Sequence, residues 1–369
     1  MLNTGINISM QRIFFLDGFR GLAITLVILF HAFSRWADYL PYGDTYGRFP
    51  IFAFGWTGVY LFFLISGFVI LMTLEKCDSF GDFLRRRWLR LFPAMLMATV
   101  FIFICSNVLT APPRGIPNLR DSLPGLLFIE PIWFEKIFSV PFRALDGTFW
   151  TLFAEVQFYL VFGGMYFCFK KRIAIALIVL LYCISMVFSW MDRAQIGGDS
   201  AHVFHTLFLR IGAGNFGWFS AGALMYLYAK EKRFFYFSLS LLLAFFSSVS
   251  TGMFSSSFDF FMSTAYCFLI FVVFALPFLV PLVQRLFENS VLVYLGYVSY
   301  PLYLIHQNAM LSMIKMLHSA FDFLPGWFLP VPPLIFLLLF ADLISRFGER
   351  FIKKYLHKAI SLCRGRISV

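Results

Sequence analysis

Charged residues are scarce in this chain of 369 residues, since Asp, Glu, Lys and Arg together make up 13% of it. Soluble domains carry about 25% charged residues and about 45–50% apolar ones, whereas 60% of this chain is apolar. These proportions exclude a water-soluble fold, because one core of this size cannot hide so much apolar surface. They predict a protein that lies in a lipid bilayer.

Cysteine is scarce as well, with six in the chain. None falls in a predicted external loop, which excludes a disulfide framework, and their spacing does not fit metal ligands. We therefore expect no metal and no tightly bound cofactor. The net charge of +11 comes without a basic binding module, so membrane orientation explains it better than a nucleic-acid partner.

Long apolar runs are what the chain has in abundance. A membrane-spanning helix needs about 20 such residues, and the runs predict an all-α bundle of about ten transmembrane helices. We place these spans at about 13–35, 54–75, 91–110, 148–169, 173–191, 203–229, 234–250, 259–281, 291–317 and 324–345.

The distribution of Lys and Arg predicts the orientation of these spans. Positive residues collect in short cytoplasmic loops. With the N-terminus inside, 20 fall in the inner segments and 7 in the outer ones, which favours ten spans with both termini in the cytoplasm. We expect one transmembrane domain over 1–345, without a cleavable signal, and a basic cytoplasmic tail over 346–369. The proline-rich connection 111–147 would lie outside and cap a site.

Ionisable residues in the first span need a reason, because a charge near the bilayer centre costs about 2.5–3.5 kcal/mol on insertion scales. On a helix, Asp17, Arg20 and His31 share one stripe. The helical rise places Arg20 and His31 about 16 Å apart, with Arg20 near the cytoplasm and His31 in the outer half.

Other spans carry polar groups at the predicted depth of His31. They include Glu155 in the fourth span, Arg210 in the sixth and His306 in the ninth, where Tyr300 and Tyr303 precede the histidine by one to two turns. The set indicates a shared polar cavity. The alternative is that these groups form hydrogen bonds that hold the helices together.

A basic run, Arg85 to Arg87 with Arg90, precedes Pro93 at the predicted inner face. Two interpretations stay open. The run orients the protein and touches anionic lipid, or its guanidinium groups clamp the phosphates of a ligand.

Five segments together resemble acyltransferase family 3, the membrane-bound O-acyltransferases that modify bacterial surface glycans. They are residues 16–23 (LDGFRGLA) followed by His31, 58–68 (GVYLFFLISGF), 86–93 (RRWLRLFP), 149–159 (FWTLFAEVQFY) and 295–306 (LGYVSYPLYLIH). The departures are small: Phe19 replaces a more usual Leu, and the residues before Glu155 differ from the usual Ser-Leu-x-Val.

The resemblance implies transfer of an acyl group, commonly acetyl, from cytoplasmic acyl-CoA to a hydroxyl of a cell-surface polysaccharide or lipid-linked sugar. It implies a multi-pass protein of the bacterial inner membrane. His31 would act as general base or take the acyl group itself, and Glu155 would orient it. Arg20, Arg86, Arg87 and Arg90 would bind the donor. The remaining pocket residues would be Asp17, Ser66, Arg210, Tyr300, Tyr303 and His306.

A membrane transporter for a small molecule or a glycan precursor is the competing class, because inward-facing ionisable residues also build transport pathways. The chain shows no internal repeat and no inverted halves, which weighs against this alternative.

Overall fold

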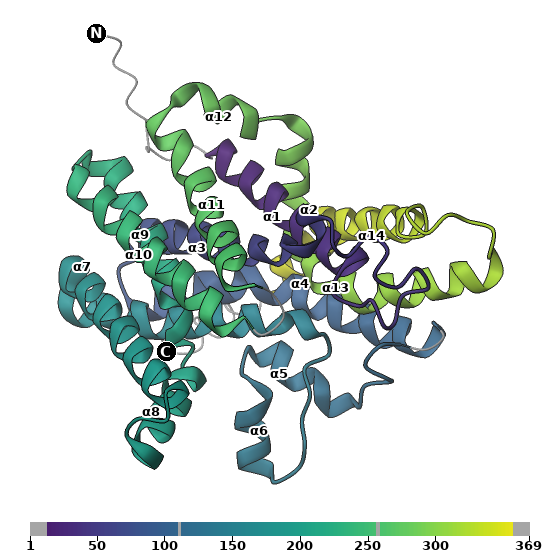
Figure 1. The fold of residues 1–369 in the computed structure, drawn as a ribbon, viewed down its shortest axis with the longest axis horizontal. Coiled ribbons are helices and arrows are strands. Elements are labelled where there is room, and N and C mark those ends of the chain that lie inside the picture. Colours follow the sequence, from purple (N-terminus) through teal and green to yellow (C-terminus); the bar gives the residue numbers. More distant parts are fainter. Residues whose placement is uncertain (1–12, 110–111, 256–258, 357–369) are drawn as a thin grey trace, which may run out of the picture. The chain divides into compact units, whose positions relative to one another are not determined.

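A computed structural model describes residues 13–109, 112–255 and 259–356 of the chain, and within these residues it contains helices and no strands (Figure 1). The long helices are α1 (Phe14–Phe33), α3 (Gly58–Leu74), α4 (Phe80–Val108), α7 (Trp150–Arg193), α8 (Gly198–Arg210), α9 (Phe216–Glu231), α10 (Phe234–Phe254), α11 (Phe260–Leu279), α13 (Ser290–Ala320) and α14 (Val331–Leu343). The all-α prediction is confirmed.

Seven helical stretches are long and apolar enough to cross a membrane, and they make the chain a multi-pass membrane protein. They are Phe14–Phe33, Gly55–Leu74, Phe80–Val108, Gly147–Arg193, Phe234–Phe254, Phe260–Leu279 and Val331–Leu356. Two predicted spans are not among them. Helix α9 has 16 residues, and α13 includes polar residues such as His306 and Gln307.

Helix α7 accounts for two of the predicted spans. It runs over 44 residues, and its backbone leaves the helical conformation at Lys170, where φ is 65° and ψ is 167°. This kink falls in the basic segment that the sequence predicted as the connection between spans 148–169 and 173–191. A straight helix of this length would reach about 66 Å, far more than the roughly 30 Å of a bilayer core.

The prediction of one helix over 203–229 is wrong. The chain leaves α8 after Arg210, turns at Gly212 with a φ of +70°, and passes through the 3-10 turn η4 (Ala213–Asn215) before α9 begins. Glycine is the residue that adopts this left-handed conformation without steric cost. The apolar composition on both sides of Gly212 hid the break.

The last helix extends further than predicted. After α14 the chain forms a π-helical turn, η5 (Ile344–Gly348), and stays helical to Leu356. The predicted start of the tail at residue 346 therefore lies within this helix, and residues 357–369 of the predicted tail lie outside the described residues. The predicted external connection 111–147 holds two short helices, α5 (Ser122–Leu127) and α6 (Pro131–Phe138).

The chain divides into two compact units, each built from three separate segments. The first comprises residues 1–27, 56–84 and 151–295, and the second comprises 28–55, 85–150 and 296–369.

In the first unit, α3 packs against α9, α9 against α10, and α10 against α11 (Figure 1). Glycines let α3 and α9 approach backbone to backbone. A Cβ on Gly67 would lie 1.8 Å from the carbonyl oxygen of Phe219, and one on Gly222 would lie 2.0 Å from that of Leu64. Close packing of this kind holds membrane helices together, since lipid supplies no hydrophobic driving force between them.

In the second unit, α4 contacts both α13 and α14. The hydroxyl of Tyr300 on α13 donates a hydrogen bond to the carbonyl oxygen of Leu91, and the rings of Phe101 and Phe340 lie 4.4 Å apart. At the end of α1, Phe33 stacks on Phe52 of α2 (Pro50–Ala53) at 4.6 Å. These contacts hold the last turn of α1, which carries His31, in the same unit as α13.

Candidate active site

Two histidines far apart in the sequence meet in the second unit. Nδ1 of His31, in the last turn of α1, lies 3.1 Å from Nε2 of His306 on α13. The ring centroids are 5.1 Å apart and the planes are inclined by 60°. His306 is fully buried, whereas His31 is half-buried. His31 is therefore the member of the pair that a substrate can approach.

The hydrogen-bond partners fix the tautomers of both rings. Nδ1 of His306 lies 2.9 Å from the carbonyl oxygen of Tyr303, and because a carbonyl only accepts, this nitrogen carries the proton. In neutral His306, Nε2 is then an acceptor, and His31 donates to it from Nδ1. In the neutral form of His31 the unprotonated nitrogen is then Nε2, the atom that a general base or a nucleophile requires.

A buried aspartate, which sequence reasoning missed, organises the surroundings of His306. Asp146 is 1% exposed and accepts hydrogen bonds from the backbone and hydroxyl of Thr148, both at 2.9 Å, and from the backbone of Asn308 at 3.2 Å. Its negative charge also acts on His306. Asp146 caps the turn η3 (Gly147–Phe149) before a long apolar helix, and this capping position was the available signal.

The two predicted pocket tyrosines of α13 donate to backbone carbonyls. The hydroxyl of Tyr303 lies 3.3 Å from the oxygen of Thr148, and that of Tyr300 lies 3.1 Å from the oxygen of Leu91. A phenol has one proton to donate, so in this geometry both hydroxyls tie α13 to neighbouring segments.

Glu155, in the first unit, accepts hydrogen bonds from two hydroxyls. Ser66 of α3 is one donor, and Tyr159, one turn further along α7, is the other at 2.6 Å. The structure thus brings together two of the predicted site residues, Ser66 and Glu155. Glu155 and His31 belong to different units, and their contact stays a prediction.

Asp17 and Arg20 form an ion pair on α1. The Asp17 Oδ1 to Arg20 Nη1 distance is 2.7 Å, and the two side chains are 10% and 18% exposed. The predicted common stripe on the first helix therefore produces a direct contact. A buried charge is tolerated in a membrane helix when a partner neutralises it.

The remaining predicted arginines have different surroundings. Arg87 is buried at 4% exposure, whereas Arg86 and Arg90 are exposed. Arg210 ends α8 with its side chain half-buried, and its backbone oxygen accepts a hydrogen bond from Gln157 at 2.8 Å. Of the predicted donor-binding residues in the basic run, Arg86 and Arg90 are the exposed ones.

The described residues contain no group of three or more His, Cys, Asp or Glu side chains that could hold a metal ion.

The fold and the site together define a class of protein, namely a helical multi-pass membrane protein with a histidine pair in its second unit. A family model described as an acyltransferase domain, that of acyltransferase family 3, matches residues 13–345. The chain belongs to this family, as the five sequence segments predicted.

Three named relatives are similar over part of the chain. Peptidoglycan O-acetyltransferase OatA of Listeria monocytogenes is 28% identical over 210 residues, which cover 52% of this chain and 30% of that protein. Putative peptidoglycan O-acetyltransferase YrhL of Bacillus subtilis is 28% identical over 213 residues, again 52% and 30%. O-acetyltransferase OatA of Staphylococcus aureus is 27% identical over 162 residues, or 40% and 23%. The chain thus spans less than a third of each relative's length, and no solved structure matches it.

Proposed function

We propose that this protein is an integral-membrane O-acyltransferase that moves an acyl group, acetyl by preference, from acyl-CoA to a hydroxyl of a surface polysaccharide or a lipid-linked sugar. The observation that carries the proposal is the bond between His31 and His306, which leaves a lone pair on the more accessible ring. Membership of the acyltransferase family supplies the reaction class.

The transfer step follows from the tautomers. Nε2 of His31 takes the proton of the acceptor hydroxyl while the oxygen attacks the thioester carbonyl. The tetrahedral intermediate then expels coenzyme A by cleavage of the C–S bond, and the thiolate takes up the proton from His31. During the step, Nε2 of His306 accepts the hydrogen bond of the imidazolium Nδ1–H. The alternative in which His31 first takes the acyl group uses the same lone pair.

Arg86, Arg87 and Arg90 would hold the donor's phosphates at the cytoplasmic face. Arg20 would bind the donor further along the way to His31. Guanidinium groups suit this role because they bind phosphate oxygens in a fork. Two exposed side chains in that run support the assignment of Arg86 and Arg90. Glu155 would orient His31 or stabilise its positive charge.

We infer ten membrane passes with both termini in the cytoplasm. The kink at Lys170 supports counting α7 as two passes. The short helix α9 and helix α13, which includes polar residues, would supply the two remaining passes. The excess of Lys and Arg in the inner segments supports the orientation. The expected location is the bacterial inner membrane, with acyl-CoA inside and the acceptor outside.

The relatives named peptidoglycan O-acetyltransferases support a glycan as acceptor and acetyl as the acyl group. We extend the acceptor class to surface polysaccharides and lipid-linked sugars, because each presents a sugar hydroxyl to the outer face. No nucleic acid takes part in this reaction.

The proposal is tested with purified protein in proteoliposomes that are loaded with acetyl-labelled coenzyme A and receive surface glycans in the outer solution. We expect label in an ester on the glycan, released by mild base. Uptake of a glycan or small molecule with no ester formed would contradict the proposal and favour a transporter.

A further inference from the structure

The first unit contains a cavity of about 520 Å³ that the proposed transfer step does not use. It opens where α3 begins and where α7 and α10 end, with α8 and η4 completing its wall. These are the helix ends that the proposed topology places on the outer side of the membrane. A volume of this size is typical of a site for a small molecule.

Aromatic side chains line part of the cavity. Trp56 and Tyr60 lie edge to face with ring centroids 5.8 Å apart. Tyr60 is fixed in turn by stacking on Trp218 at 4.9 Å. Such rings offer a rigid apolar surface, which suits the C–H face of a pyranose.

Hydrogen-bonding side chains also line the cavity. His205 of α8 and Ser189 of α7 are joined by a bond of 2.9 Å between Nδ1 and the hydroxyl oxygen, and Asp192 lies 3.8 Å from the other ring nitrogen. Asn215 and Thr251 add an amide and a hydroxyl to the wall.

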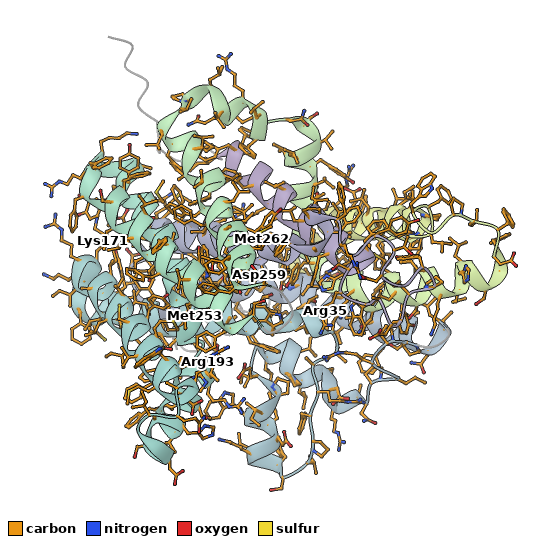
Figure 2. The ribbon with its side chains drawn as sticks, viewed as in Figure 1. Arg35, Lys171, Arg193, Met253, Asp259 and Met262 are labelled. Carbon is orange, nitrogen blue, oxygen red and sulfur yellow. The ribbon has the colours of Figure 1, made fainter. Side chains whose placement is uncertain are left out.

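The end of α10 that borders the cavity is held by α7. Arg193 donates a hydrogen bond to the carbonyl oxygen of Met253, and its guanidinium lies 5.7 Å from the ring centroid of Phe254, a lining residue. Figure 2 shows Arg193 and Met253 close together at this end of the unit. The wall is therefore braced by contacts outside the cavity itself.

The charge of the wall selects the ligand. No lysine, arginine, aspartate or glutamate is among the described residues that line the cavity, so it offers no counter-charge to a phosphate, a carboxylate or an ammonium group. Aromatic faces beside amide, hydroxyl and imidazole groups instead match a neutral compound with many hydroxyls. We propose that this cavity binds a neutral sugar unit of the acceptor glycan. That this glycan is the acceptor of an acyl group rests on the proposed function.

Gly214 allows the cavity to be closed without disturbing its walls. A Cβ at this position would meet only Met186 Cε, at 3.8 Å, which is ordinary contact. The substitution Gly214→Phe therefore places a ring in the cavity. Gly164 on α7 has nothing within 4 Å of its Cβ position and does not line the cavity, so Gly164→Phe is the matched control.

The test measures binding of fluorescent tetrasaccharides of glucose and of N-acetylglucosamine to the full chain in lipid nanodiscs, without acyl-CoA. A galacturonic acid tetrasaccharide serves as the anionic probe. We expect saturable binding of at least one neutral probe, at least tenfold weaker binding in Gly214→Phe, several-fold weaker binding in Asn215→Ala, and unchanged binding in Gly164→Phe. The anionic probe should bind at least tenfold more weakly.

The site is refuted if no neutral probe binds, if both cavity variants bind like the wild type, or if the anionic probe binds equally well. Asn215→Ala keeps the test decisive should Gly214→Phe fail to fold. Because no donor is present, the assay is independent of catalysis. Sugar binding without acyl transfer would overturn the proposed function alone, and transfer with no binding at this cavity would overturn the present inference alone.

Discussion

Nδ1 of His31 donates to Nε2 of His306 across 3.1 Å, and the carbonyl oxygen of Tyr303 holds the far nitrogen of His306 at 2.9 Å. The backbone of α13 thereby determines which nitrogen of His31 carries a lone pair. In hydrolase triads a carboxylate performs this orienting role. Here the group at Nδ1 of His31 is an imidazole, and a buried carboxylate, Asp146, lies near that imidazole.

His306 is a positioning residue, and its substitution should affect the rate more than donor binding. We expect His306→Phe to lower kcat about 100-fold, because it removes the acceptor for His31 Nδ1–H. His306→Gln keeps an acceptor oxygen and should retain more activity. The check is the pH profile of kcat/KM, which should shift in His306→Phe. A profile of wild-type shape with reduced amplitude would indicate a structural role only.

Asp146 should be important for stability. Asp146→Ala removes the acceptor of three hydrogen bonds, two from Thr148 and one from the backbone of Asn308, and the expected loss is about 1–3 kcal/mol for each buried group left unsatisfied. Asp146→Asn retains one acceptor oxygen and should lose less. Thermal unfolding in detergent measures both. Equal unfolding temperatures for wild type and Asp146→Ala would contradict this account of η3.

The contact between α3 and α9 should not tolerate a methyl group. Gly67→Ala places a Cβ 1.8 Å from the backbone oxygen of Phe219, so the helices must separate, at a cost of about 1–3 kcal/mol. Gly164→Ala is the control, since its Cβ meets nothing within 4 Å and alanine favours a helix. Unfolding temperatures of the two variants test the prediction. A Gly67→Ala protein as stable as the control would show that the helices are not in backbone contact.

An acid-sensitive ion-pair network joins α3, α7 and α9. Glu75 contacts Lys230 at 2.6 Å, Tyr226 at 2.5 Å and Lys171, labelled in Figure 2, at 3.0 Å. Burial alone raises the pKa of Glu75, but these hydrogen bonds together outweigh it and hold the pKa below its ordinary value. Glu75 is therefore more acidic in the folded state than in the unfolded state.

The sign of this shift sets the pH dependence of stability. A depressed carboxyl pKa stabilises the fold above the unfolded value of roughly 4.3, and the contribution is lost as the pH falls through the folded value. Wild type should be more stable than Glu75→Gln at pH 7, and the difference should narrow below about pH 4. Unfolding followed across this range is the measurement, and a pH-independent difference would contradict the role of the Glu75 charge.

The exposed arginines of the basic run should affect donor binding. We expect Arg86→Gln with Arg90→Gln to raise the KM for acetyl-CoA several-fold with little change in kcat, the signature of lost ground-state contacts. Arg120→Gln, in the exposed part of the connection before α5, is the control. An unchanged donor KM would favour the alternative in which the run orients the protein and touches anionic lipid.

The sequence predicted the helices whose signal is local. Uniform apolar runs gave α1, α3, α10 and α11, and the basic residues at 170–172 marked the kink in α7. The break at Gly212 was missed because the residues on both sides fit one apolar span. A single positive φ is a backbone property that composition does not report.

The sequence predicted most residues of the candidate site, but it did not predict which of them contact one another. Periodicity on one helix was enough to place Asp17 beside Arg20. The pair of His31 and His306, 275 residues apart, depends on tertiary packing that spacing does not contain. Asp146 was missed because it lies in a loop, and its burial follows from hydrogen bonds to α13.

The most direct measurement of the central claim is the rate of acetyl transfer from labelled acetyl-CoA to glycan by His31→Ala. The variant should be purified, inserted and folded as well as Thr25→Ala, a control on the same helix whose hydroxyl bonds to the backbone of Gly21. Loss of a general base costs about 10²- to 10⁴-fold, so His31→Ala should transfer at a background rate while Thr25→Ala keeps the wild-type rate. Transfer by folded His31→Ala within a few-fold of wild type would contradict the account.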